Sequence, residues 1–139
     1  MSVGFLLDKS ALARWSHAGV AAVLNPLLGT GQLWTCPIIE LEVRYSARDA
    51  AEFDQVSRDR AIAYRWAELT EEVGSTALAM QAELAHHSHL RAVGVPDLLI
   101  AATAASYDLT VLHYDADFDT LARFVVLGHR WVVPRGTCP

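Results

Sequence analysis

Short apolar runs alternate with stretches of helical character along most of this 139-residue chain. The runs predict strands at residues 3–7, 32–36, 110–113 and 131–133, because each is brief and bounded by polar or turn-forming residues. Parallel strands need a crossover between them, which a helix usually supplies. The alternation therefore predicts an α/β fold with a small central parallel sheet and helices on both of its faces.

Local signals mark where several of the crossover helices begin. Ser10 is a candidate cap for a short helix over residues 11–15, and Pro37 fits the first turn of a helix that runs to about Ala47. The other crossover helices are expected at residues 20–28, 96–107 and 115–124.

The middle of the chain predicts a helical hairpin with arms at residues 49–70 and 75–87. An interrupted apolar stripe on the first arm indicates a face that packs on the sheet or on a partner. The stripe consists of Phe53, Val56, Ala63 and Trp66. No linker or repeat divides the sequence, so residues 1–139 are expected to form a single domain.

The composition is that of a globular protein, with 53% hydrophobic and 19% charged residues. Polar and turn-forming residues interrupt the longest uncharged stretch, residues 20–39, so no membrane-spanning helix is expected. The N-terminus lacks the pattern of a signal peptide, and the two cysteines, Cys36 and Cys138, form neither a disulfide framework nor a zinc motif. These features favour a cytoplasmic protein with reduced thiols.

Acidic residues beside apolar segments are the strongest chemical signal. Asp8 and Asp115 follow predicted strands, Asp97 opens a predicted helix, and Glu42 lies in the apolar-rich stretch 38–43. Ligands of parallel α/β sheets bind beyond the carboxyl ends of the strands, where Asp8 and Asp115 are expected. Carboxylates that converge there would repel one another unless a hard cation bound them. A metal-dependent hydrolase is therefore the leading hypothesis, although a net charge of −5 argues against simple adhesion to polyanions.

Each acid also has a structural explanation when it is taken alone. Asp8 fits a turn or a helix cap, Asp97 fits the positive end of its helix, and Asp115 and Asp117 fit the opening of the next helix. Glu40 and Glu42 stand two residues apart on a predicted helix, so at most one of the pair is expected to face the site. The alternative function is a noncatalytic module whose acids are structural or vestigial and which acts by binding RNA or by forming a regulatory complex.

Three segments and one glutamate carry a resemblance to a known family. They are Leu7-Asp8-Lys9-Ser10-Ala11, Glu42, Pro96-Asp97-Leu98-Leu99-Ile100-Ala101-Ala102 and His113-Tyr114-Asp115-Ala116-Asp117-Phe118. In this order and spacing the pattern resembles a PIN domain, and more narrowly the VapC-type toxins of bacterial type II toxin–antitoxin systems. The resemblance covers the chain from Leu6 to about Val133.

The resemblance implies an α/β/α sandwich and a Mg²⁺- or Mn²⁺-dependent endoribonuclease. It gives catalytic roles to Asp8, Glu42, Asp97 and Asp115, metal-binding roles to Asp8, Asp97 and Asp115, and auxiliary roles to Asp117 and Ser10. It also implies an RNA substrate, an antitoxin partner, a homodimer, and contact with operator DNA only through the antitoxin.

The chain departs from the family pattern in two places, and one is the absence of the common glycine soon after the glutamate, where this chain has Arg44-Tyr45-Ser46. The family often has Thr, Ser or another small polar residue two positions before its fourth acid, and this chain has His113 there. A packed, hydrogen-bonded histidine is the favoured interpretation of that residue.

Overall fold

The computed structural model describes residues 4–139, and a five-stranded, all-parallel sheet forms its centre. The strands lie in the order β3-β2-β1-β4-β5, so β1 is the middle strand. Their bounds are β1 Phe5–Leu7, β2 Leu33–Thr35, β3 Arg65–Trp66, β4 Thr110–His113 and β5 His129–Trp131. The parallel sheet expected from the sequence is confirmed.

Seven helices accompany the strands within residues 4–139. None of the described helices is long and apolar enough to cross a membrane. The helices are α1 Lys9–Leu12, α2 Ala18–Gly29, α3 Pro37–Arg44, α4 Ala50–Ala63, α5 Glu71–His86, α6 Val95–Tyr107 and α7 Ala116–Ala122.

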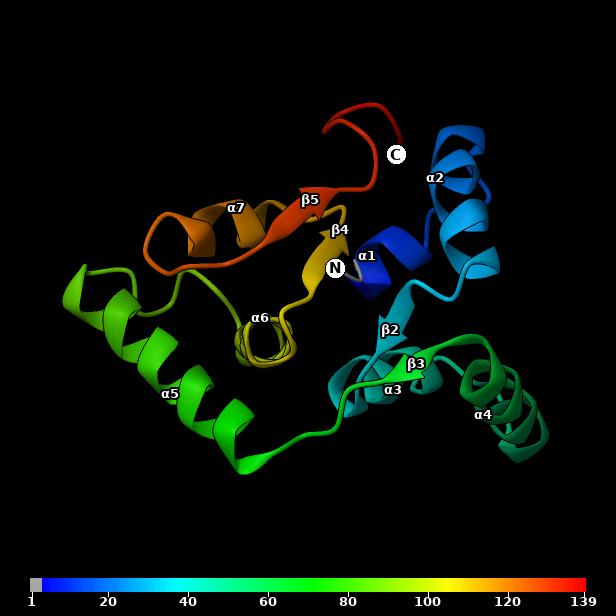
Figure 1. Ribbon diagram of the computed structural model, residues 1–139, viewed down its shortest axis with the longest axis horizontal. Coiled ribbons are helices and arrows are strands. Elements are labelled where there is room, and N and C mark those ends of the chain that lie inside the picture. Colours follow the sequence, from blue (N-terminus) through cyan, green and yellow to red (C-terminus); the bar gives the residue numbers. More distant parts are fainter. Residues whose placement is uncertain (1–3) are drawn as a thin grey trace.

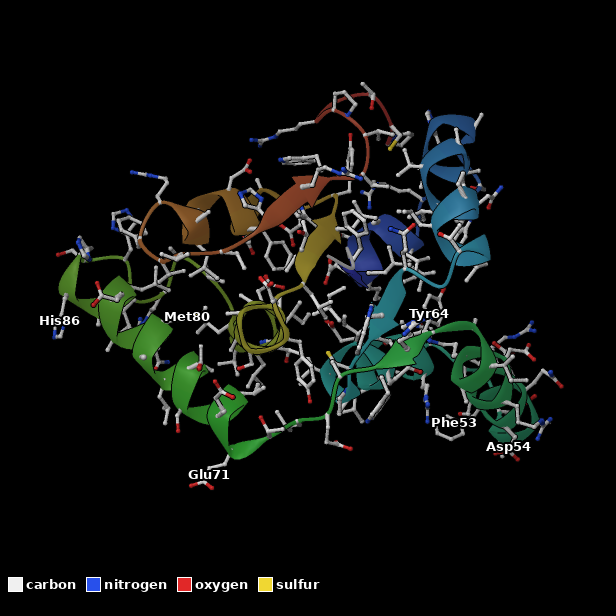
Figure 2. All side chains as sticks on the ribbon, viewed as in Figure 1. Phe53, Asp54, Tyr64, Glu71, Met80 and His86 are labelled. Carbon is white, nitrogen blue, oxygen red and sulfur yellow. The ribbon has the colours of Figure 1, made fainter. Side chains whose placement is uncertain are left out.

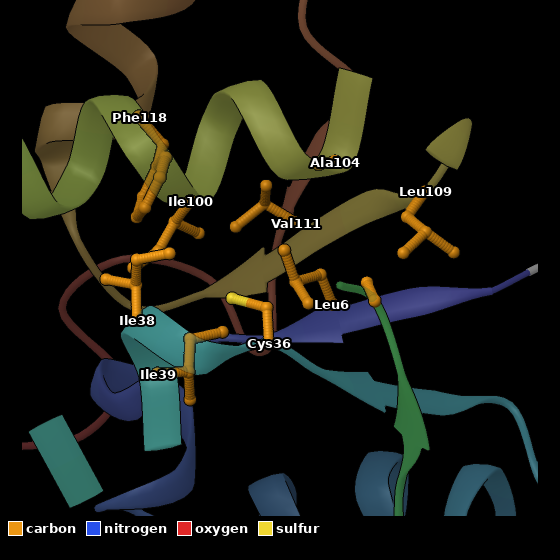
Figure 3. Packing of buried hydrophobic residues seen from close by; sticks show 10 residues of the cluster. Leu6, Cys36, Ile38, Ile39, Ile100, Ala104, Leu109, Val111 and Phe118 are labelled. Carbon is orange, nitrogen blue, oxygen red and sulfur yellow. The ribbon is translucent and has the colours of Figure 1, made fainter. Parts of the chain in front are cut away.

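Helices cover both faces of the sheet, because successive strand side chains point to opposite sides. Leu6 and Val111 point to the face where α3 and α6 pack, as Figure 3 shows. Phe5, Leu7 and Leu112 point to the other face, where they pack in a cluster with residues of α1 and α2. Burial on both sides explains why these strands read as continuous apolar runs in the sequence.

A third cluster joins α5 to α6 and α7 and lies beside the sheet rather than on it. Met80 of α5 is 5% exposed and packs in this cluster (Figure 2). The cluster holds α6 between the sheet and α5, which fixes the position of the first turn of α6. Asp97 lies in that turn.

The predicted helical hairpin is corrected by the structure. The long arms exist as α4 and α5, but β3 separates them and pairs with β2 in the sheet. α5 packs along α6, and Figure 1 shows α4 and α5 at opposite sides of the molecule. The predicted stripe is not a buried face: Phe53 is 41% exposed and Trp66 47% exposed. Arg60 is the buried residue of α4.

Several boundaries also differ from the prediction. The first helix begins at Lys9, with Asp8 and not Ser10 as its N-cap. The last strand is residues 129–131 rather than 131–133, and α3 ends at Arg44. The first strand begins at Phe5, and the part of its predicted range at Val3 lies outside the described residues.

Candidate active site

The predicted acids meet at the topological switch point of the sheet, where the strand order reverses from one side of β1 to the other. The chain places β2 on one side of β1 and β4 on the other, and β1 and β4 pair in parallel with Leu7 opposite Leu112. Asp8 directly follows β1, and its backbone N–H donates to the Leu112 carbonyl at 3.0 Å. Asp115 follows β4 by two residues. Such a switch point is where open parallel sheets bind ligands.

Asp8 is held in a fixed direction by Ser10. The Asp8 carboxylate is 4% exposed and accepts hydrogen bonds from the Ser10 N–H at 3.0 Å and the Ser10 hydroxyl at 2.5 Å. The same hydroxyl accepts from the Tyr114 N–H at 2.9 Å, which ties the ends of β1 and β4 together. Burial raises the pKa of Asp8, the Ser10 bonds oppose that rise, and the charge of Asp115 adds to it. Ser10 is thus a connector between two strand ends.

Asp97, Asp115 and Asp117 bring one carboxylate oxygen each to within 4.8 Å of one another. Asp97 lies in the first turn of α6, and Asp115 caps α7 by accepting the Asp117 N–H at 2.9 Å. Burial raises the pKa of Asp97 to about 8, helped by a hydrogen bond with Asp117 and by the charges of Asp115 and Asp8. A carboxyl group that is buried beside other acids in this way indicates a place where positive charge would be stabilising.

Glu42 completes the group from α3. Burial raises the pKa of Glu42, and the charge of Asp8 raises it further. Its Oε1 atom is buried and has no hydrogen-bond partner among residues 4–139. A buried acceptor without a partner is costly, and a cation or a cation-bound water would satisfy it.

Glu40 belongs to a different site, which decides between the two glutamates. Its carboxylate accepts from Thr35 at 2.6 Å and pairs with Arg60 at 2.8 Å and Arg44 at 3.1 Å. Burial alone would raise the pKa of Glu40, but the bonds from Arg60 and Thr35 and the charge of Arg60 hold it below its ordinary value. Glu40 therefore anchors α4 to β2 and α3, while Glu42 adjoins Asp8.

Exchanging the two glutamates separately is expected to have opposite effects. For the Mn²⁺-dependent RNA cleavage that the family resemblance implies, Glu42→Gln should lower the rate by about 10-fold or more. Its metal-free melting temperature should be unchanged or higher, because repulsion with Asp8 is relieved. Glu40→Gln should lower the melting temperature by several degrees, because Arg60 loses its charged partner. Cleavage rates and calorimetry on both variants measure this, and equal losses of stability would contradict the assignment.

His113 lies directly behind Asp115. It is fully buried, its Nδ1 accepts from the Asp115 N–H at 3.1 Å, and its Nε2 lies 3.0 Å from His129 Nδ1. Burial and the neighbouring His129 lower the pKa of His113 to about 4, so it is neutral near pH 7. The expected packed, hydrogen-bonded histidine is confirmed.

No pattern in the sequence pointed to the residues that surround His113. His129 comes from β5, and the Trp131 indole N–H donates to Asp119 of α7 at 3.1 Å. His129 and Trp131 are distant in the chain from His113, and no motif connects them to it. Only the pairing of β4 with β5 brings them together.

Asp8, Glu42, Asp97, Asp115 and Asp117 are called the acidic cluster below. Its donors are all carboxylate oxygens, which suit a hard cation such as Mg²⁺ or Mn²⁺ rather than zinc. The unpartnered Glu42 oxygen and the raised pKa of Asp97 both fit such an ion. The arrangement can bind a divalent cation beside the carboxyl ends of β1 and β4.

The comparisons with known proteins agree with this geometry. The family model described as PIN domain matches residues 5–124. Ribonuclease VapC51 of Mycobacterium tuberculosis is 39% identical over 140 residues, covering 99% of this chain and 98% of that protein.

Solved structures show the same fold. DNA-bound VapBC from Salmonella typhimurium has a TM-score of 0.74 at 17% identity, covering 94% of this chain and 99% of that one. VapBC-5 from Mycobacterium tuberculosis, a member of the VapBC family of toxin–antitoxin systems, has a TM-score of 0.62 at 21% identity, covering 94% and 98%. With a family match over most of its length and a full-length relative at 39% identity, this chain belongs to the PIN-domain family, within its VapC ribonuclease group.

Proposed function

We propose that this chain is a metal-dependent endoribonuclease that acts as the toxin of a toxin–antitoxin pair. The observation that carries the proposal is the acidic cluster at the switch point of the sheet, in which the pKa of Asp97 is raised to about 8. The names of the relatives, which are ribonucleases, support the reaction, and the VapBC neighbours support the toxin role.

Each acid has a proposed task. Asp8, Asp97 and Asp115 would hold Mg²⁺ or Mn²⁺. Asp117 would assist them, since its carboxylate has an oxygen within 4.8 Å of ligand oxygens of Asp97 and Asp115. A cation at this place would polarise the scissile phosphate and lower the pKa of the attacking water. Glu42 orients that water through its unpartnered oxygen, and Ser10 keeps the Asp8 carboxylate aimed at the site.

Removal and return of metal on a circular RNA tests the reaction. The protein treated with EDTA is expected to leave the circle intact, and added Mn²⁺ or Mg²⁺ should restore cutting to linear products, since only an endonuclease opens a circle. Gel analysis of the products measures this. Binding of RNA without any cutting under either cation would instead support the noncatalytic alternative.

The antitoxin is proposed to cover α3 beside the acidic cluster. Leu41 and Tyr45 of this region are 72% and 91% exposed. A hollow of about 460 Å³ lies there, next to the position of Glu42. Its walls are formed by Pro37, Glu40, Leu41, Arg44, Tyr45, Phe53 and Trp66. An apolar surface of this kind fits an amphipathic helix or extended segment of a partner.

The same proposal includes an RNA substrate, a homodimer and contact with operator DNA through the antitoxin only. A second exposed apolar surface, on α5 and α6, is available for the homodimer. Leu78 is 69% exposed and Val95 61% exposed, and both line a shallow groove between these helices. This surface shares no lining residue with the hollow at α3.

A further inference from the structure

The backbone at Asp115 is held from two directions. Its N–H donates to His113 Nδ1 at 3.1 Å, and its carboxylate accepts the Asp117 N–H at 2.9 Å. The residue has extended backbone angles, as an N-cap requires. With the N–H and the carboxylate both bound, the side chain has little freedom to turn away from Asp97.

The hydrogen bonds fix the tautomer of His113. A backbone amide can only donate, so His113 Nδ1 must present its lone pair to Asp115. The proton of the neutral ring therefore lies on Nε2, which faces His129 Nδ1 at 3.0 Å and donates to it. The two ring nitrogens have different tasks, since one holds the Asp115 loop and the other ties the ring to β5.

This tautomer also excludes a second metal site at the neighbouring histidines. Potential ligand atoms of His113, Asp119 and His129 lie within 4.8 Å of one another. However, His113 Nε2 carries the proton and has no lone pair left for an ion, because the fixed Asp115 N–H occupies the other nitrogen. The group is therefore a support for the acidic cluster.

We propose that His113 is a positioning residue that sets the direction of the Asp115 carboxylate through its Nδ1 atom and is itself anchored to β5 through His129. The inference rests on the proposed function, because it treats Asp115 as a metal ligand. His113 stands where the family often has Thr, Ser or another small polar residue, and the buried ring reaches both Asp115 and the neighbouring strand. Groups that orient metal ligands typically change metal affinity about 10- to 100-fold when they are lost.

The variants His113→Asn and His113→Gln separate the tasks of the two ring nitrogens of His113. In His113→Asn the side-chain oxygen stands where Nδ1 was and can still accept from Asp115, but the link to His129 is lost. In His113→Gln the amide nitrogen stands near the Nε2 position and can still donate to His129, but no acceptor faces Asp115. Both exchanges replace the ring by a smaller neutral amide, so a purely structural role predicts similar losses for both.

Mn²⁺ affinity without RNA is the deciding measurement, by calorimetric titration of the full chain, together with the metal-free melting temperature. His113→Asn should bind Mn²⁺ within about 3-fold of the wild type, and His113→Gln about 10-fold or more weakly. If the Gln variant binds as tightly as the wild type, or if the two lose affinity equally, the inference is wrong.

His129→Leu is a second test in case neither His113 variant folds. The side chain of His129 is 21% exposed, so its exchange disturbs the core less than exchange of the fully buried His113. It should weaken Mn²⁺ binding, since the His113 ring loses its anchor, and unchanged affinity would overturn the inference. Wild type and Asp97→Asn are titrated in parallel. A wild type that binds no Mn²⁺ defeats the proposed function itself, whereas tight wild-type binding with a normal Gln variant defeats only the role of His113.

Discussion

Asp97→Asn is expected to reduce Mn²⁺-dependent RNA cleavage by about 100-fold or more, since loss of a group that merely orients a ligand already costs 10- to 100-fold. Asp97 stands at the centre of the acidic cluster, where Asp8, Asp115 and Asp117 all act on its pKa. The amide keeps the shape of the side chain but cannot supply a negative oxygen to a cation. Cleavage rates across a Mn²⁺ titration measure the effect.

Asp108→Asn is the matched control for this variant. Asp108 ends the same helix, is exposed, and has a left-handed backbone with φ 54°, which asparagine also tolerates. This variant makes the same exchange of aspartate for asparagine far along α6 from the site and should cut RNA at the wild-type rate. If Asp97→Asn cut RNA as fast as this control, the proposed role of Asp97 would be refuted.

The raised pKa of Asp97 gives the metal-free protein a defined pH dependence. The folded protein keeps a proton on Asp97 up to about pH 8, while the unfolded chain releases it near the ordinary value of 3.8. The folded state thus binds more protons between these values, so its stability should fall as pH rises through this window. The raised pKa values of Asp8 and Glu42 act in the same direction.

Bound metal should oppose the fall of stability with rising pH, because a cation favours the ionised form of the carboxylates. Mn²⁺ affinity is expected to rise with pH up to about 8, with release of protons. In EDTA, the melting temperature of Asp97→Asn should change less with pH than that of the wild type. The Mn²⁺ affinity of this variant should also depend less on pH. Calorimetry at several pH values measures both, and a wild-type stability in EDTA that rises from pH 5.5 to 8 would contradict the coupling.

Arg60→Met is expected to lower the free energy of unfolding by about 3 kcal/mol, the lower end for removing one partner of a buried ion pair. Arg60 is 7% exposed and is the buried residue of α4, where it pairs with Glu40. Arg44 and Thr35 still contact Glu40 after the exchange, which is why the lower end applies. For a chain of this length the loss corresponds to a fall in melting temperature of about 10 °C.

Arg58→Met is the control on the same helix, since Arg58 is exposed and donates a local hydrogen bond to Gln55 at 3.2 Å. Thermal unfolding followed by circular dichroism compares the variants near pH 7. The pKa of Glu40 is held below its ordinary value, so the stability that its ion pair contributes should be lost only as the pH falls below that ordinary value. A melting temperature of Arg60→Met equal to that of Arg58→Met would show that α4 is held by other contacts.

The local sequence pattern was enough to predict most strands of the sheet and to place the acids beside strand ends and helix starts. Residues 110–113 form a strand as predicted, and Pro37 begins a helix, because both signals are short-range and strong. The predicted helical hairpin was wrong, since Arg65 and Trp66 form a strand only by pairing with β2. Such an edge strand has no sequence period of its own, and the neighbouring strand supplies its hydrogen bonds.

The sequence by itself determined that Asp8 and Asp115 stand at strand ends and that Asp97 opens a helix. Apolar runs and helix starts depend on residues that are neighbours in the chain. Tertiary structure alone decided which glutamate joins them. Residues two apart on a helix point about 200° apart, and the partner that takes Glu40 away is Arg60, on the next helix. It likewise placed His129 behind His113, since only the pairing of β4 with β5 brings the two rings within hydrogen-bond distance.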